Sequence, residues 1–256
     1  MIAAALLPLL LSQAPQCVNV GGARTCGFNC VDNGARAECA QTPFGVCAKN
    51  GGAVKCFDPP TWLQAVWKTP PKPTCLTDGT TIACGYDCKR FGGNSQCAQT
   101  PNGVCSVTGG YLTCFDPPPE VYGAYGGEVP APTCLVREGM AACGYSCRTA
   151  NGKTMCAKTP FGVCGDDGRD PVCFDPPKAV ICAKGKDTPK PKCVPTGGSF
   201  MTCGYTCATA SSTTVCSQTP DGTCDTNGPG KPQCFDPPAR GGSAACLEAA
   251  AASPSK

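Results

Sequence analysis

The sequence contains no histidine among its 256 residues, and it has few charged and few large apolar side chains. Without imidazole, Ser-His-Asp and Cys-His catalysis, haem attachment through Cys-x-x-Cys-His and Cys₂His₂ zinc sites are all excluded. Leu, Ile, Val and Phe make up only about an eighth of the residues after residue 14, below the roughly 20% that a packed core requires. Charged residues amount to 15% with a net charge of +3, so we expect no nucleic-acid partner.

Cysteine, glycine and proline are abundant instead, with 26, 32 and 27 copies. Such a cysteine content is typical of a disulfide scaffold in an oxidising compartment. Residues 1–14 are apolar, carry no charge and end in Ser-Gln-Ala, which predicts a signal peptide, although a buried N-terminal helix is the alternative. The stretch is too short to span a membrane. We therefore expect a secreted, periplasmic or cell-surface protein that is not membrane-spanning.

Four copies of one six-cysteine unit account for 24 of the cysteines. Each copy carries a CG[FY]xC segment, a TPxG segment and the segment CFDPP, and the copies repeat about every 59 residues, which indicates an internal repeat. We expect four modules at residues 17–60, 75–118, 134–177 and 193–238. Their cysteines are Cys17, Cys26, Cys30, Cys39, Cys47 and Cys56; Cys75, Cys84, Cys88, Cys97, Cys105 and Cys114; Cys134, Cys143, Cys147, Cys156, Cys164 and Cys173; and Cys193, Cys203, Cys207, Cys216, Cys224 and Cys234.

The eight-residue gaps between these cysteines predict tight β-hairpins. Nine of the ten such gaps have glycine in the central pair, where a two-residue hairpin turn needs a positive φ. The flanking cysteines then face each other across the two strands, so a disulfide can staple each hairpin. An interlocked pairing between hairpins is the alternative, because six cysteines allow 15 connectivities.

The predicted fold class is therefore a small, disulfide-rich, all-β protein with four tandem modules of short hairpins. Each module is expected to have six short strands, with a corner at CG[FY]xC and a turn at TPxG. The corner aromatics and the Phe residues of CFDPP are predicted to form a small apolar centre in each module. The Pro-rich linkers are expected to be semi-rigid spacers between separate modules, with apolar middles that fold back on the adjoining module.

Two cysteines fall outside the repeat. Cys182 lies in the third linker and Cys246 follows the fourth module, so we predict a Cys182–Cys246 bond that encloses the last module. Bridges to other chains are the alternative. The tail at 247–256 is expected to be disordered.

The leading functional hypothesis is a non-enzymatic binding, adhesion or structural surface module. The frame residues repeat whereas the turn tips vary, as in binding modules that carry variable loops on a rigid frame. The expected partner is a protein or polysaccharide surface. The candidate contact residues are the TPxG tips and the linker aromatics: Phe44, Asn102, Phe161, Asp221, Trp62, Trp67, Tyr122 and Tyr125.

Three other functions are weaker. A protease inhibitor would need a rigid exposed loop, for which Lys49, Arg90 and Arg148 are candidates. A thiolate metal site would need reduced cysteines at closer spacing than CxxxC. The carboxylate inside each FDPP segment has no acid–base partner nearby and is expected to anchor a turn. We thus expect no catalytic, cofactor or metal site.

Overall fold

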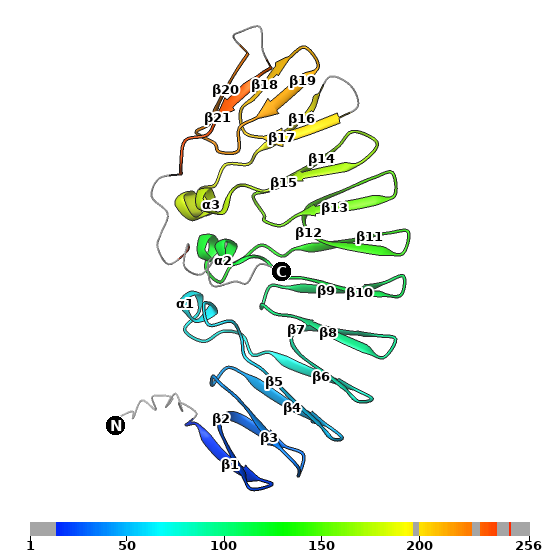
Figure 1. Cartoon of the computed structure of the whole chain (residues 1–256), viewed down its shortest axis with the longest axis vertical. Coiled ribbons are helices and arrows are strands. Elements are labelled where there is room, and N and C mark those ends of the chain that lie inside the picture. The colour runs from blue at the N-terminus through cyan, green and yellow to red at the C-terminus, as the bar shows by residue number, and fades with distance from the viewer. Residues whose placement is uncertain (1–13, 197–199, 227–230, 240–245, 247–256) are drawn as a thin grey trace, which may run out of the picture.

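The computed structural model describes residues 14–196, 200–226, 231–239 and 246. Short antiparallel hairpins stack one after another in chain order and form a curved array (Figure 1). The hairpin tips fan out on the convex side of the arc, and three short helices lie along its concave side. The chain is therefore an all-β, disulfide-rich repeat protein.

The strands recur in the same order from module to module. Module one contains β1 (Gln16–Val20), β2 (Ala23–Asp32), β3 (Ala37–Ala40), β4 (Val46–Asn50) and β5 (Ala53–Phe57). Module two contains β6 (Thr74–Asp78), β7 (Thr81–Phe91), β8 (Asn94–Ala98), β9 (Val104–Thr108) and β10 (Tyr111–Phe115). Module three contains β11 (Thr133–Arg137), β12 (Met140–Ala150), β13 (Lys153–Ala157), β14 (Val163–Asp166) and β15 (Pro171–Phe174). Module four contains β16 (Lys192–Thr196), β17 (Phe200–Gly204), β18 (Cys207–Ala210), β19 (Thr213–Cys216), β20 (Thr223–Asp225) and β21 (Gln233–Phe235).

The expected corner at CG[FY]xC is a bend within one strand in the first three modules. There β2, β7 and β12 run through the segment with a β-bulge, and each is shared between two hairpins. The residue before the last cysteine of the CG[FY]xC segment takes a positive φ, for example 36° at Asp87, so the strand turns without ending. The expected six strands occur only in module four, where β17 and β18 are separate.

Each hairpin is closed by a disulfide between its own two strands. The first and second, third and fourth, and fifth and sixth cysteines of every module are bonded, with the paired Cα atoms 4.0–4.1 Å apart. The interlocked alternative does not occur. Cys182 bonds Cys246, with Cα atoms 5.6 Å apart. All 26 cysteines lie in the described part of the chain, and none of them is a free thiol.

The linkers are not spacers, because each one folds into a short helix that packs against its neighbours. The helices are α1 (Leu63–Val66), α2 (Pro119–Tyr125), α3 (Lys178–Lys184) and the 3₁₀ helix η1 (Gly185–Asp187). Apolar residues of α1 and α2 bury one another on the concave side, and α3 lies next to α2; we call this row of helices the helix column (Figure 1). Burial of apolar area outweighs the preference of proline-rich chain for an extended form.

The modules are not separate beads either, because the third hairpin of one module packs on the first hairpin of the next. The expected apolar centre of each module is instead divided between neighbours, since the Phe of CFDPP pairs with the corner Tyr of the following module. Ring centroids lie 5.9–6.1 Å apart, edge to face, in the pairs Phe57–Tyr86, Phe115–Tyr145 and Phe174–Tyr205. A single module of some 40 residues buries too little apolar area alone, and stacking supplies the rest.

Candidate functional site

The aspartate of each FDPP segment holds the TPxG turn of its own module. In module two, the Oδ1 atom of Asp116 accepts hydrogen bonds from the amides of Gln99 and Thr100 and from the Thr100 hydroxyl, all at 2.8 Å. The same contacts recur in the other modules with Asp58, Asp175 and Asp236. The turn glycine is required because a Cβ on Gly103 would meet Asp116 Oδ1 and the Ala98 methyl group. These carboxylates are engaged in structure.

The four predicted linker aromatics gather in the helix column. Trp62 and Trp67 both contact Tyr122, with ring centroids 5.1 and 5.7 Å apart. Tyr122 is fully buried, and this burial raises the pKa of its hydroxyl to about 12. Tyr125 extends the row toward module three. The structure therefore uses these side chains to join α1 to α2, and only Trp62, Trp67 and Tyr125 stay partly exposed to solvent.

The TPxG tips lie against the helix column instead of projecting as loops. The Asn102 amide donates to the Tyr122 hydroxyl at 3.3 Å, and Phe161 is only 2% exposed because it stacks on Tyr125 at 5.3 Å. Asp221 faces Lys184 of α3 at 3.8 Å. Phe44 is half-buried. The variation among tips thus matches the variation among the helix residues that they contact.

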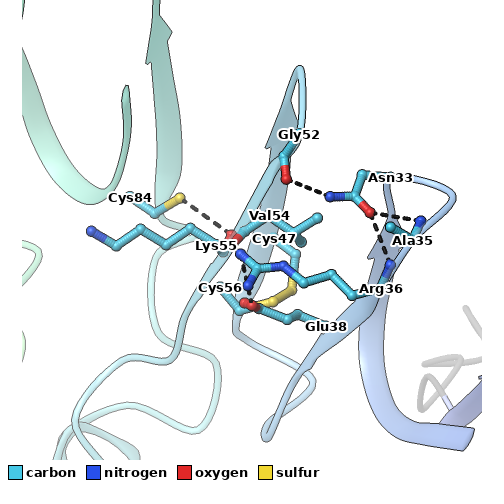
Figure 2. A network of polar contacts seen from close by, with 10 residues as sticks. All are labelled: Asn33, Ala35, Arg36, Glu38, Cys47, Gly52, Val54, Lys55, Cys56 and Cys84. Atoms are coloured by element: carbon cyan, nitrogen blue, oxygen red, sulfur yellow. Dashed lines mark hydrogen bonds and ion pairs between the residues drawn. A yellow bond between two sulfur atoms is a disulfide. The ribbon is translucent and has the colours of Figure 1, made fainter. Parts of the chain in front are cut away.

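Polar contacts tie the hairpins of module one to each other and lead to the first junction (Figure 2). The Asn33 side chain donates to the carbonyl of Gly52 and accepts from the amide of Arg36, at 2.6 and 2.9 Å. Arg36 in turn donates to the carbonyl of Val54 at 3.4 Å. Val54 lies in the hairpin β4–β5, and on the far side of this hairpin the sulfur of Cys84, from module two, lies 4.0 Å from the Lys55 carbonyl oxygen. Neighbouring hairpins are therefore linked through side chains as well as through packed rings.

The corner tyrosines at the junctions, which we call the junction tyrosines, are Tyr86, Tyr145 and Tyr205. Each hydroxyl donates to a proline carbonyl of the preceding linker, at 3.0, 2.9 and 3.1 Å. Burial raises the pKa of all three, to about 12 for Tyr86 and Tyr205. A raised pKa means that the junctions favour the neutral phenol.

Two of the cavities that adjoin the array lie beside residues described above. One of about 340 Å³ lies between α3 and module four, where Asp221 stands at the position that Phe161 fills in module three. The other, about 470 Å³, is lined by polar residues of the first two modules, including Lys55, Gln96 and Gln99. Both are open to solvent.

The convex side carries exposed apolar side chains at neighbouring hairpin tips. The tips of β9–β10 and β11–β12 lie close together, since a Cβ on Gly109 would clash with Gly139. The β7–β8 tip adjoins them, since a Cβ on Gly110 would lie 3.8 Å from the Phe91 ring. Phe91, Tyr111 and Met140 flank these tips and are 42%, 67% and 57% exposed. We call this surface the tip edge. The central pairs of the turns do not reveal this surface, because its apolar side chains belong to the residues that flank each pair.

The residues proposed for other functions are placed as follows. Lys49, Arg90 and Arg148 lie within paired strands, not in loops, because the hairpins continue to within a residue of each tip. No cysteine has a thiolate to offer a metal, and the described residues contain no cluster of three or more metal-ligating side chains. No helix in the described ranges is both long and apolar enough to cross a membrane.

The chain matches no protein family, and neither a curated protein nor a solved structure is significantly similar to it.

Proposed function

We propose that this chain is a non-enzymatic structural protein of an oxidising compartment, secreted or held in the cell envelope, which provides a rigid curved scaffold. The observation that carries the proposal is the unbroken stacking of stapled hairpins across all three module junctions. Each staple closes only nine or ten residue spacings, so no hairpin can open far without breaking a covalent bond. A chain that must hold its shape outside the cell benefits from such local closure.

Mechanical extension of single molecules tests the scaffold. With the disulfides intact, the chain should lengthen only in small steps as the junctions separate. Each disulfide keeps the residues of its hairpin from extending, and each of those residues would otherwise add about 3.3–3.6 Å of length. After reduction, the same chain should extend fully at lower force. A chain that extends equally with and without reductant would contradict the scaffold role.

The tip edge supports a second function, contact with a protein surface. Its exposed side chains are mainly apolar, with Phe91, Met140 and Val136 beside Tyr111. Exposed apolar patches of this kind mark interaction surfaces. This arrangement favours a protein partner over a polysaccharide, because carbohydrate sites combine an aromatic face with several polar groups.

Sedimentation with washed cell envelopes tests this contact. The double variant Tyr111→Ser/Met140→Ser should lose most of its retention, whereas Phe200→Ser, which removes another exposed apolar side chain, should keep it. Retention abolished by protease treatment of the envelopes identifies a protein partner. Retention that survives protease but not glycosidase assigns the contact to polysaccharide instead.

A further inference from the structure

The module junction is one interface used three times in this chain. On one side it presents the outward face of a third hairpin, as with Gly165 and Phe174 of β14–β15. On the other side it presents the face of a first hairpin that carries the disulfide, as with Met201, Cys203 and Tyr205 of module four. A Cβ on Gly165 would meet the Met201 sulfur, so these two positions oppose each other directly.

Each end of the arc exposes one half of this same interface. At one end, the trailing face of β20–β21 carries Phe235, which is 69% exposed, although the equivalent Phe174 is half-buried against Tyr205. At the other end, the leading face of β1–β2 leaves Cys26 exposed, although the equivalent Cys203 is 7% exposed. The two faces lie at opposite ends of the arc (Figure 1).

The charges on these two faces are complementary. The trailing face has Asp225 at the position of Gly165, one residue after the fifth cysteine of its module. The leading face has Arg24 at the position of Met201, two residues before the second cysteine. Both side chains are exposed. Continuing the junction geometry from one copy to the next would therefore oppose a carboxylate and a guanidinium, which attract each other.

The aromatic pair is complementary as well. The leading face has Phe28 where the other modules have a junction tyrosine. The junction tyrosines need the proline carbonyl of a preceding linker for their hydroxyl groups. Phe28 has no hydroxyl, so a second copy can cover it without leaving a buried donor unsatisfied.

We propose that copies of this chain stack end to end, with β20–β21 of one copy against β1–β2 of the next. The two faces differ, so the contact is heterologous: each added copy leaves a new open face, and assembly continues into longer curved oligomers. The inference rests on the proposed structural role, since it extends the scaffold beyond the length of one chain.

Sedimentation velocity of the full disulfide-bonded chain, from about 1 μM to about 1 mM, tests the stacking. The wild-type chain should form oligomers of increasing size with concentration, and salt should weaken them. Arg24→Glu and Asp225→Lys should each weaken association at least tenfold, and the double reversal should restore it. Lys153→Glu, the same charge change on an exposed side chain in the middle of the arc, should have no effect.

A wild-type chain that stays monomeric over this range overturns the proposal. The proposal is also overturned if either single charge reversal leaves association unchanged, or if the double reversal fails to restore it. Small-angle scattering of the same samples keeps this result separate from the scaffold role. A monomer whose scattering fits the rigid arc refutes only the stacking, whereas a flexible, extended profile refutes the scaffold itself.

Discussion

Replacing Asp116 with alanine should open the TPxG turn of module two and leave the other three turns intact. The Asp116 carboxylate accepts three hydrogen bonds from this turn, two of them from Thr100, which is only 4% exposed. Gln99 is exposed, so water can replace its bond to Asp116. The cost of the substitution therefore comes mainly from the buried amide and hydroxyl of Thr100.

The magnitude follows from these two bonds. A hydrogen bond to a charged group contributes about 1.5 kcal/mol at the lower end of the observed range, so two of them amount to about 3 kcal/mol. Because 1.4 kcal/mol corresponds to a factor of ten, the turn should open about 100 times more often. Asp116→Asn keeps a neutral acceptor and should increase opening only about tenfold.

Amide hydrogen exchange followed by NMR measures this opening residue by residue. The Thr100 amide should lose about 100-fold in protection in Asp116→Ala. The equivalent amides of Thr42, Thr159 and Thr219 serve as internal controls, because their own aspartates are unchanged. Asp170→Asn removes an exposed ion pair with Lys153 and should change the stability by less than about 1 kcal/mol.

Two results would refute this reasoning. If the Thr100 amide kept its wild-type protection in Asp116→Ala, the carboxylate would not be what holds the turn. If all four turns lost protection together, the anchors would not act locally, and the array would open as a single unit.

Three further predictions concern packing, pH and the long disulfide. In denaturant titrations, Gly103→Ala should lower the free energy of unfolding by about 1–3 kcal/mol, because the added Cβ is crowded. The control Gly52→Ala has no atom within 4 Å of its added Cβ and should change the free energy of unfolding by less than about 0.5 kcal/mol. Equal effects of the two substitutions would contradict the steric argument. On the alkaline side, stability should hold up to about pH 10 and fall between about pH 10 and 12. The pKa of each junction tyrosine is higher in the folded than in the unfolded state, so the unfolded chain loses its protons first. A denaturation midpoint that does not move while tyrosinate absorbance rises would exclude this. Replacing Cys182 and Cys246 by serine should lower the free energy of unfolding by about 4 kcal/mol, because the bond closes a 64-residue separation. This loss should exceed that from removing any hairpin disulfide with a separation of nine residues. A smaller loss would show that chain entropy is not the main contribution of the long disulfide.

Local features of the fold could be predicted from the sequence because they depend on residues close together in the chain. A Gly-rich pair midway between two cysteines predicts both the turn and the register, so the hairpins follow from spacing. The pairing of the cysteines did not, because an interlocked pattern was equally allowed until the structure showed each bond within its own hairpin. A turn anchored by each FDPP aspartate was also predicted, but the turn was not identified, because the TPxG amides that it binds lie 16–18 residues away across a hairpin. The Cys182–Cys246 pair was identified as the remainder after the repeats were aligned.

The arrangement of the modules could not be predicted, because it depends on contacts between repeats. Phe57 and Tyr86 were predicted to lie in separate apolar centres, but the structure pairs them across a junction. Nothing in the spacing distinguishes a phenylalanine that packs within its module from one that packs on the next.

The linkers show the same limit. Their prolines predicted extended spacers, yet each linker contains a short helix that contacts the helix column. Leu63 and Tyr122 are fully buried there because helices some 60 residues apart lie side by side. Tertiary packing overrides local preference wherever it buries enough apolar area.

The cysteine and glycine spacing by itself determined the hairpins, because the two cysteines of each hairpin are only nine or ten residues apart. The recurrence of that spacing determined the fourfold repeat. Only the tertiary structure decided that the repeats stack into one curved array and that the linker aromatics pack together in the helix column. It also placed the exposed side chains of Arg24 and Asp225 on the first and the last hairpin of that array. These features arise between modules, where the free energy comes from apolar surface that no single module can bury.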